Sequence, residues 1–440
     1  MVTNVGMLGY GTVGAGVAWI MFGQGELLSQ KVGHPLRLVK AVVRDLAAKR
    51  DNPPPLGFLT DDPLEVVGNP DIQVVVEVMG GIEPARSLIL RALESGQHVV
   101  TANKALLATH GRELFDTAAA HGRELNFEAA AAGAIPVIRT LKEGLAANRI
   151  RSVFGILNGT TNYILDLMTK DRTHSVPYEA HLKAAQDLGY AEADPTMDVD
   201  GTDAAQKLVL LTALAYGTLP TVDDVRPEGI TRLEPLDFVF ADELGYVIKL
   251  LAMANLPKEG GRLEVRLKPT MIPKEHLLAG VPGAMNAVMI RGHAAGDIFL
   301  SGAGAGMRPT ASAVVGDIID TAKVGATGHP SAQPSLGWHG IKAEGILPPG
   351  ESRTRHFLRF TVRDLPGVLS AISGILGRHG ISIAQVIQRG SGPEGAPVTL
   401  VMLTHTAKEK DVEEALVEAS RLDALTAGTR RVTVEDFGDK

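Results

Sequence analysis

A single lysine, Lys207, stands shortly after a dense run of carboxylates and directly before the apolar run LVLLTALAY. Two glycines and a proline interrupt the acidic part, so we expect it to form a loop, with a helix from Thr202 onward. Asp203 and Lys207 are four residues apart on that helix and share one face, where they can pair. The acidic side chains ahead of the lysine are Asp187, Glu192, Asp194, Asp198, Asp200 and Asp203.

This stretch supports three interpretations. The first is a solvated acidic loop that caps a surface helix, which is the common role of a charge run. The second, a calcium loop of the EF-hand type, fails because the alignment puts Thr196 at the first ligand position and Lys207 where a bidentate glutamate belongs. The third is a polar site on a buried helix, in which a lysine beside an aspartate transfers protons and spare carboxylates hold an ammonium group. The first and third remain open on these residues alone.

The strand and helix that must flank a nucleotide site are both predicted at the start of the chain. Residues 2–8 form a short apolar run, the motif GYGTVG follows at 9–14, and a helical pattern begins immediately afterwards. In this context the first glycine permits a tight turn, the second lets the backbone approach a pyrophosphate, and the third lets helix and strand pack closely. The alternative is a structural glycine turn. We predict a dinucleotide site that includes Gly9, Gly11, Thr12, Val13 and Gly14.

The residue after the second predicted strand bears on the choice of cofactor. Residues 36–43 read as that strand, and Arg44 follows where an NAD-preferring enzyme usually carries an acidic residue. An arginine there can accommodate a 2′-phosphate, whereas Asp45 stands one position too late to compete. The sequence therefore favours NADP, with NAD as the alternative. An exposed arginine that binds no ligand is the competing interpretation.

Two later strands end in residues that could contribute to the same site. Residues 71–79 read as a buried parallel strand that leads into Gly80, and residues 97–101 read as the next strand, which leads to Lys104. Because the carboxyl ends of strands in an open α/β sheet face the ligand crevice, Lys104 is expected where chemistry occurs. The alternative is a solvated lysine at a strand end.

Two rows of small residues allow close backbone approach. EAAAAGAIP at 128–136 could expose carbonyl groups that coordinate a hard monovalent cation. GAGAGMRPT at 302–310 opens a helix that could return to the first domain and cover the cofactor. Otherwise this second row is a flexible connector.

These patterns predict an α/β protein of several domains. A Rossmann-type nucleotide domain is expected over residues 1–138, completed by about 303–330, with an α+β substrate and dimerisation domain inserted over 139–302. GILPPGESR at 345–353 reads as a linker. Beyond it, the predicted order strand, helix, strand, strand, helix, strand over 354–440 is the ferredoxin-like arrangement.

Composition excludes several classes of protein. A net charge of -7 argues against a nucleic-acid or anionic-membrane partner. The chain has no cysteine, which excludes disulfides, thiolate metal ligands and a thiolate nucleophile. The N-terminus lacks a signal-peptide pattern, and no apolar run approaches the roughly 18 residues that a membrane helix requires. We expect a cytoplasmic enzyme.

Six motifs in order resemble monofunctional homoserine dehydrogenases with a C-terminal ACT domain. No kinase-like region precedes Met1, so we do not expect the form fused to an aspartokinase. Together the motifs span most of the chain, which makes the set more specific than any one of them. They are GYGTVG at 9–14, TANK at 101–104, EAAAAGAIP at 128–136, LNGTTNYIL at 157–165, GYAEADPTMDVDGTDAAQK at 189–207 and GAGAGMRPTASAVV at 302–315, and DLPGVL at 364–369 matches the ACT loop.

This resemblance implies NAD(P)-dependent interconversion of L-homoserine and L-aspartate 4-semialdehyde, in threonine, methionine and isoleucine biosynthesis. It makes Lys207 and Lys104 the proton-transfer candidates, with Asp203 orienting the lysine and binding substrate. The further positions that it implies are Glu192, Gly189 and Thr160 for the substrate, Gly80, Lys104 and Gly306 for the cofactor, Glu128, Ala131, Gly133 and Ile135 for sodium or potassium, and Asp364, Gly367 and Val368 for an amino-acid effector.

Other functions remain to be weighed against this one. A non-catalytic sensor would combine a nucleotide-binding domain with an ACT module but would not need the Asp203 and Lys207 pair. A related amino-acid dehydrogenase would differ in substrate size. For the ACT module we expect feedback regulation, with threonine as the first candidate effector, and the alternative is a dimerisation module without a ligand. A homodimer or homotetramer is expected.

Overall fold

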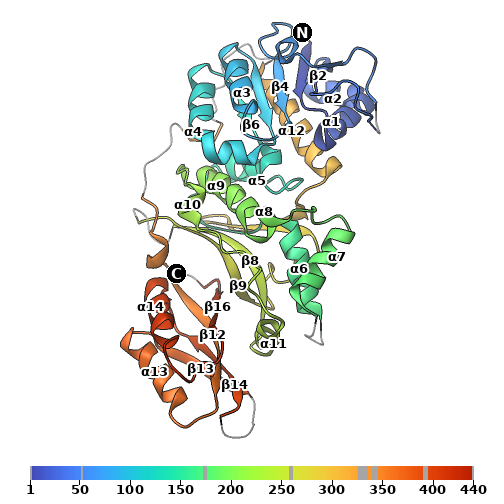
Figure 1. Cartoon of the computed structure of the whole chain (residues 1–440). Coiled ribbons are helices and arrows are strands. Elements are labelled where there is room, and N and C mark those ends of the chain that lie inside the picture. The colour runs from blue at the N-terminus through green and yellow to red at the C-terminus, as the bar shows by residue number, and fades with distance from the viewer. Residues whose placement is uncertain are drawn as a thin grey trace. The chain divides into compact units, whose positions relative to one another are not determined.

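The computed structural model describes residues 2–50, 53–171, 176–256, 261–325, 335–338, 345–389 and 395–438. These residues form two compact units, each assembled from three segments of the chain (Figure 1). The first unit comprises residues 1–159, 203–222 and 284–344, and the second comprises 160–202, 223–283 and 345–440.

A parallel six-stranded sheet forms the nucleotide-binding part of the first unit. Its strand order is β3-β2-β1-β4-β5-β6, so the order reverses beside β1, which pairs with both β2 and β4. Ligands bind at such switch points in open α/β sheets. The strands are β1 Thr3–Leu8, β2 Leu36–Val42, β3 Leu59–Thr60, β4 Val74–Glu77, β5 His98–Thr101 and β6 Leu125–Asn126. The predicted α/β fold is confirmed.

Helices α1 and α12 pack together although they are far apart in sequence. Gly16 of α1 has no room for a side chain, because a Cβ there would lie 2.8 Å from the carbonyl oxygen of Met307 in α12. Ala311, Val314 and Ile318 of α12 join the same buried core as β1. The glycine-rich segment at 302–306 therefore leads into a helix packed on the nucleotide-binding part. The helices are α1 Thr12–Gly23, α2 Gly25–Val32, α3 Ala85–Glu94, α4 Lys104–Ala120 and α12 Met307–Gly325, with the 3-10 turn η1 Pro63–Glu65.

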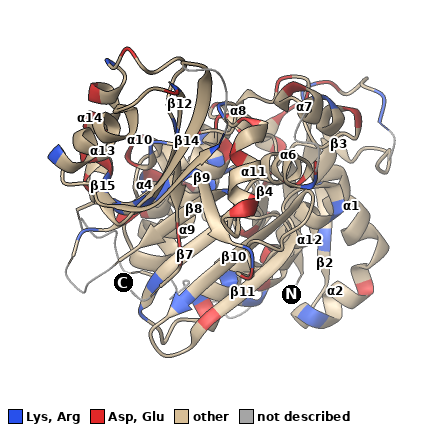
Figure 2. Cartoon of the chain, turned by 90° about the horizontal axis from the view of Figure 1, so that it is seen from below, with Lys and Arg blue, Asp and Glu red and all other residues tan. Residues whose placement is uncertain are grey.

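The rest of the first unit combines three antiparallel strands with a buried helix. Strand β10 pairs with β7 on one side and with β11 on the other (Figure 2). Every residue of helix α9 from Asp203 to Tyr216 is buried, so the interpretation as a surface helix is wrong. The elements are η2 Glu128–Ala130, α5 Val137–Arg139, the π-helical turn η3 Thr140–Gly144, β7 Ile150–Ile156, α9 Thr202–Tyr216, β10 Met285–Gly292 and β11 Gly296–Ala303.

In the second unit a continuous sheet joins the middle of the chain to its C-terminal part. Its order is β8-β9-β16-β12-β14-β13, and β9 pairs in parallel with β16 through Thr270↔Thr433 and Met271↔Val434. The strands are β8 Tyr246–Asn255, β9 Glu264–Pro273, β12 Arg353–Arg363, β13 Ile383–Arg389, β14 Pro397–Thr404, β15 Ala407–Lys408 and β16 Arg430–Val434. The helices are α6 Gly159–Lys170, α7 Tyr178–Asp187, α8 Thr196–Val199, α10 Val222–Val225, α11 Pro235–Glu243, α13 Val368–Arg378 and α14 Glu409–Ala419, with the 3-10 turn η4 Pro349–Glu351.

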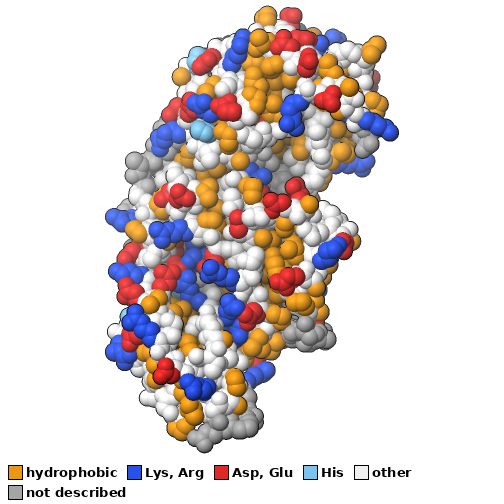
Figure 3. All heavy atoms as spheres, in the orientation of Figure 1, with side chains coloured by type: hydrophobic (Ala, Val, Ile, Leu, Met, Phe, Trp, Pro, Cys, Tyr) orange, Lys and Arg blue, Asp and Glu red, His pale blue; other side chains and the backbone are white. Residues whose placement is uncertain are grey.

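The C-terminal part has the predicted ferredoxin-like order of elements. Strands β12, β13, β14 and β16 alternate with α13 and α14 in a βαββαβ sequence, and apolar side chains from both helices pack on the sheet. On the face seen in Figure 3, acidic and basic side chains are interspersed over the chain.

Three details differ from the sequence expectation. The acidic segment was expected to be all loop, but it contains the single helical turn α8, which Pro195 allows because proline is tolerated at a helix start. Strand β8 was not predicted, since its run of apolar residues carries no alternation. The segment at 345–353 is bonded to the residue just before β9 rather than free, because Leu263 N–H donates to Gly345 O and Leu347 N–H donates to Leu263 O. The sequence also predicts a loop over residues 325–337, and most of these residues lie outside the part of the chain that the structure describes.

Among the described helices, none has both the length and the apolar character needed to cross a membrane.

Candidate active site

Asp203 lies between two lysines in the first unit. Lys207 Nζ is 2.7 Å from Asp203 Oδ2, and Lys104 Nζ is 3.2 Å from Asp203 Oδ1. The side chain of Lys207 is 10 % exposed, whereas that of Lys104 is 33 % exposed. The two ammonium groups therefore share one carboxylate, and one of them has more contact with solvent.

Asp203 is held ionised by these neighbours. Burial by itself raises the pKa of Asp203, but the charges of Lys207 and Lys104 outweigh burial and hold this pKa well below its usual range. Hydrogen bonds from Lys207 and Asn158 act in the same direction. The group is consequently a fixed anion that can orient cationic donors.

The end of β7 completes this arrangement. Lys207 Nζ donates to the carbonyl oxygen of Leu157 at 2.8 Å, and Asn158 Nδ2 donates to Asp203 Oδ2 at 2.9 Å. The motif at 157–165 was noted in the sequence, but no role was predicted for Asn158. A buried amide directly after an apolar strand is the signal that could have identified it.

Lys104 is placed by its position at the start of α4. The side chain of Asn103 caps the helix by accepting from Leu106 N–H at 3.1 Å. Glu77, at the end of β4, connects this strand to the end of β5. It is a fully buried carboxylate for which no role was predicted from the sequence. Glu77 accepts from Thr101 Oγ1 at 2.6 Å and from Gly80 N–H at 3.0 Å. A carboxylate directly after the apolar run at 74–76 was the available signal.

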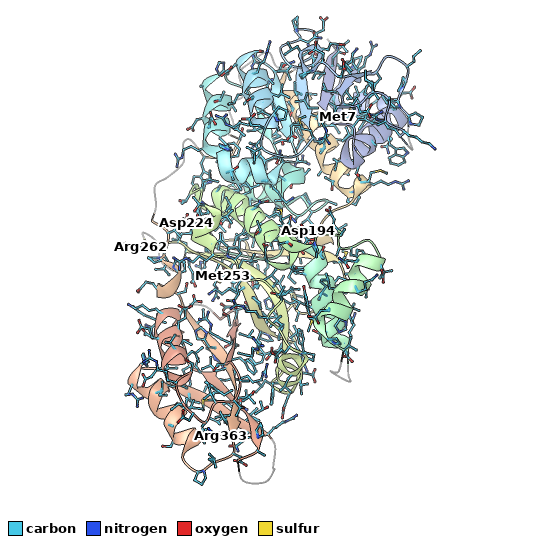
Figure 4. All side chains as sticks on the ribbon, viewed as in Figure 1. Met7, Asp194, Asp224, Met253, Arg262 and Arg363 are labelled. Atoms are coloured by element: carbon cyan, nitrogen blue, oxygen red, sulfur yellow. The ribbon has the colours of Figure 1, made fainter. Side chains whose placement is uncertain are left out.

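The glycine turn after β1 has the geometry that a dinucleotide requires. A Cβ on Gly14 would lie 2.4 Å from Gly9 O and 3.3 Å from the sulfur of Met7, which Figure 4 labels in β1. Gly9 has a φ of +104°, in the left-handed region that favours glycine. Gly11 precedes the first helical residues, Thr12 and Val13, and has open space where a Cβ would point. Backbone N–H groups at this helix start can therefore receive a phosphate.

Three other predicted cofactor positions lie around the same sheet. Gly80 follows β4 with a φ of +71° and open space beside it, and Gly306, with a φ of +127°, directly precedes α12. Arg44 is exposed just after β2. The guanidinium of Arg50 donates to the carbonyl oxygens of Asp45 and Ala48 and so closes the loop that follows Arg44.

The segment at 128–136 forms a tight turn of small residues. Ala132 and Gly133 both have a φ of +56°, and a Cβ on Gly133 would lie 2.4 Å from Gly304 O. Ala134 N–H donates to Ala303 O, so the two rows of small residues are bonded to each other. Ala131 and Ile135 belong to this same turn.

Side chains fix the ends of this turn. The carboxylate of Glu128 accepts from the N–H groups of Ile138 and Arg139 at 2.8 and 2.9 Å, and burial raises its pKa. Asp317 of α12 accepts from Glu128 N–H at 2.8 Å, and burial raises the pKa of Asp317 to about 8. The described residues contain no cluster of three or more His, Asp or Glu side chains suited to a metal ion. A cation bound at this turn would therefore depend on carbonyl oxygens.

The predicted substrate residues Thr160, Gly189 and Glu192 belong to the second unit. Thr160 Oγ1 donates to Tyr190 O at 2.6 Å, which joins the first turn of α6 to the segment at 189–192. Gly189 has a φ of +73°, and the side chain of Glu192 is exposed.

The six carboxylates of the acidic run have different roles. Asp203 alone among them contacts Lys207 in the described structure. Asp194, labelled in Figure 4, accepts from the N–H and Oγ1 of Thr196 at the start of α8. Asp200 accepts from Thr202 N–H at 2.8 Å. Two of these acids therefore shape the loop, and it is Asp203 that forms the pair predicted from helical spacing.

The predicted effector residues lie where β12 leads into α13. Asp364 Oδ1 accepts from Gln388 Nε2 of β13 at 3.3 Å. Gly367 precedes the helix with a φ of +90°, and Val368 is buried in the module core.

Family comparisons agree with this arrangement. Residues 9–128 match the family described as homoserine dehydrogenase, NAD binding domain, residues 136–319 match homoserine dehydrogenase, and residues 356–422 match the ACT domain. The match over the catalytic region disfavours the non-catalytic sensor.

Full-length relatives carry the same name. Homoserine dehydrogenase from Neisseria gonorrhoeae is 40% identical over 439 residues, with 99% of each chain covered. The enzyme from Synechocystis is 42% identical over 434 residues, with 97% of this chain and 98% of the relative covered.

Solved structures show the same relationship. A homoserine dehydrogenase from Thiobacillus denitrificans has a TM-score of 0.90 at 42% identity, covering 100% of this chain and 99% of the other. A hyperthermophilic archaeal homoserine dehydrogenase in complex with NADPH has a TM-score of 0.61 at 25% identity, covering 78% of this chain and 100% of the other. The chain belongs to the homoserine dehydrogenase family, and its residues 9–128 match the NAD binding domain of that family.

Proposed function

We propose that Lys207 and Lys104 handle the proton when the chain interconverts L-aspartate 4-semialdehyde and L-homoserine. The observation that carries this proposal is the shared contact of both ammonium groups with Asp203. In the direction of reduction, the aldehyde carbon accepts a hydride and its oxygen gains a proton from a lysine ammonium group. The reverse direction returns that proton to the neutral amine.

Each side chain of the cluster has a distinct task. Lys207 is the main proton donor, because Asp203 and the carbonyl oxygen of Leu157 fix its Nζ. Lys104, which is more exposed, exchanges protons with solvent and contacts the reacting oxygen. Asp203 stays ionised throughout and orients both donors. A bound nicotinamide supplies or accepts the hydride at the strand ends.

The substrate's amino group is assigned to Glu192. Its exposed carboxylate can pair with an ammonium group, and the contact between Thr160 and Tyr190 shapes the segment that carries it. The left-handed backbone at Gly189 lets this segment turn toward a ligand. Glu192→Gln is expected to raise KM for either substrate with a smaller change in kcat.

NADP is the proposed cofactor, with NAD as the weaker alternative. Exposed Arg44 at the end of β2 can pair with a 2′-phosphate, and the loop after it is closed by Arg50. Measuring kcat/KM for both cofactors in the wild type and in Arg44→Ala tests the assignment. An unchanged preference for NADP in the variant would reject it.

A sodium or potassium ion is proposed at the turn formed by Glu128, Ala131, Gly133 and Ile135. The small residues and the left-handed conformations suit carbonyl ligation of a hard cation. Thermal unfolding in sodium, potassium and tetramethylammonium chloride tests this site without an activity readout. Equal melting temperatures in all three salts would reject it.

We propose that the ACT domain binds an amino-acid effector, with threonine first among the candidates. Asp364 and Gly367 precede α13 and Val368 begins it, so backbone N–H groups and a carboxylate near this helix start can receive an amino acid. Titration of threonine, isoleucine and methionine against activity, in the wild type and in Asp364→Ala, tests this site. No response in the wild type would favour a dimerisation module without a ligand, and light scattering would show whether it forms a dimer or tetramer.

The reaction itself is tested by following NADPH absorbance. We expect saturable oxidation of NADPH with L-aspartate 4-semialdehyde and saturable reduction of NADP with L-homoserine. An absence of turnover with both NADP(H) and NAD(H) would reject the proposed function and leave the fold assignment unaffected.

A further inference from the structure

A buried lysine in the second unit has no part in the chemistry described above. Lys249 lies in the middle of β8 and is 3 % exposed. Its Nζ donates to the side-chain oxygen of Asn162 and to the carbonyl oxygen of Val281, both at 2.8 Å. Both acceptors are neutral, so this ammonium group is buried without a direct carboxylate contact among the described residues.

The partners of Lys249 connect two segments. Asn162 belongs to α6, and its Nδ2 donates to the carbonyl oxygens of Val281 and Gly283 at 3.2 and 2.8 Å. Asp166, one turn further along α6, accepts from Gly283 N–H at 2.9 Å. Strand β8, helix α6 and the turn at 281–283 therefore meet around one amine.

Stability alone does not account for this residue. Burying an ammonium group costs several kcal/mol, and apolar side chains of similar volume in place of both Lys249 and Asn162 would fill the same space without that cost. Burial lowers the pKa of Lys249 to about 8, while the charge of Asp166 raises it and that of Lys170 lowers it further. The buried ammonium group of Lys249 is therefore better explained by a role in holding helix α6 in place.

Helix α6 also carries the contact that shapes the predicted substrate segment. Thr160, two residues before Asn162, donates to Tyr190 O at 2.6 Å, and the rings of Tyr163 and Tyr190 lie 4.8 Å apart between centroids. The residues on both sides of Asn162 therefore contact the segment at 189–192. Moving the start of α6 would move that segment.

We propose that Lys249 is a positioning residue for substrate binding, which acts through Asn162 and the first turn of α6 on the segment at 189–192. It does not touch the substrate. This inference rests on the proposed assignment of Thr160, Gly189 and Glu192 to the substrate.

The test compares Lys249→Met with a matched control, Lys268→Met. Lys268 lies on the neighbouring strand β9, is also largely buried, and pairs with Glu409 of α14 rather than with α6. In Lys249→Met we expect KM for L-aspartate 4-semialdehyde to rise about 10-fold or more, because small displacements of binding groups have effects of this size. KM for NADPH should change less than about 2-fold, and in Lys268→Met both KM values should stay within that limit.

Lys249→Arg keeps a cation and donors at this position and should recover part of the lost affinity. If Lys249→Met does not fold, Asn162→Ala removes the other partner of the same contact and is compared with Lys268→Met in the same way. A KM for the semialdehyde equal to that of the wild type would overturn the inference. An equal rise in the KM for NADPH, or the same rise in Lys268→Met, would show general loosening and would also overturn it.

The two proposals fail in different ways. A wild-type chain that shows no turnover rejects the proposed function and this inference with it. A wild type that turns over, while Lys249→Met keeps its KM, rejects the inference alone.

Discussion

Two groups of ion-paired side chains differ in their exposure to solvent. In the first unit Asp203 pairs with Lys207 and with Lys104, whose side chain is one-third exposed. In the second unit Arg266 pairs with Glu435 at 2.5 Å, and both side chains are under 10 % exposed. An ion pair that keeps one partner near solvent can exchange protons, whereas a fully enclosed pair can only hold segments together. Exposure of one partner therefore distinguishes the Asp203 pairs, which can take part in proton transfer, from the Arg266–Glu435 pair, which holds two segments together.

The positions of the ions along their elements differ in the same way. Lys104 follows the end of β5 and Asp203 stands at the start of α9, so both lie where elements end and ligands can approach. Arg266 and Lys268 lie within β9, which pairs with β16 of the ACT domain. Their partners Glu435 and Glu409 come from the C-terminal part, so these pairs join it to the rest of the second unit.

The largest effect is expected from breaking an enclosed pair. Arg266→Met removes the guanidinium that pairs with buried Glu435 and should lower the free energy of unfolding by about 3–5 kcal/mol. Urea denaturation measures the change. Arg266→Met combined with Glu435→Leu should recover most of the loss, because both charges are then gone. A single variant as stable as the wild type would contradict a cohesive role.

The next largest effect is expected on the kcat of Asp203→Asn. The substitution keeps the shape but removes the charge that orients two ammonium groups, so kcat should fall by about 10² or more. Steady-state kinetics with saturating NADPH measure this loss, and the melting temperature serves as a control for folding. Turnover within a few-fold of the wild type would remove Asp203 from the proton-transfer apparatus.

A buried histidine near Arg266 and Lys268 predicts that stability depends on pH. Burial lowers the pKa of His356 to about 3, with the charges of Arg431, Arg266 and Lys268 acting in the same direction. Between this pKa and the ordinary value near 6.5, the unfolded chain binds a proton that the folded chain does not. Stability should therefore rise with pH across this window, by up to about 1.4 kcal/mol per pH unit, and level off above it.

His356→Gln tests this dependence, because it removes the titrating group. The variant should lose the slope that His356 contributes between about pH 3 and 6.5. Chemical denaturation at a series of pH values gives both curves. Parallel curves for variant and wild type would show that His356 does not titrate differently on folding.

The smallest effect is expected from an exposed pair. Lys170 lies one helical turn from Asp166, and its side chain is 64 % exposed. Lys170→Met should change the free energy of unfolding by less than about 1 kcal/mol. A loss as large as that of Arg266→Met would show that exposure does not separate the two kinds of pair.

Local patterns predicted much of the fold and part of the site. The glycine turn at 9–14 and the helical spacing of Asp203 and Lys207 depend on residues close in sequence, so their geometry could be predicted from spacing alone. The ferredoxin-like order of the C-terminal part followed from its succession of strands and helices.

Contacts between distant residues could not be predicted in the same way. The bond from Asn158 to Asp203 joins the end of β7 to α9, and the pairing of β9 with β16 joins residues more than 150 positions apart. The sequence left the burial of α9 open, because its polar first turn fits both a surface helix and a polar site on a buried helix until its neighbours are known. Lys249 resembles any lysine in an apolar strand until Asn162 and Val281 are placed beside it.

The most direct measurement is the kcat of Lys207→Met for reduction of L-aspartate 4-semialdehyde, with Lys268→Met as the matched buried-lysine control. Lys207 donates to Asp203, whereas Lys268 pairs with Glu409 of α14 in the second unit. We predict that kcat falls by about 10² or more in Lys207→Met and stays within a few-fold of the wild type in Lys268→Met. Near-wild-type turnover in Lys207→Met, or an equal loss in both variants, would contradict the assignment of proton transfer to the Asp203 cluster.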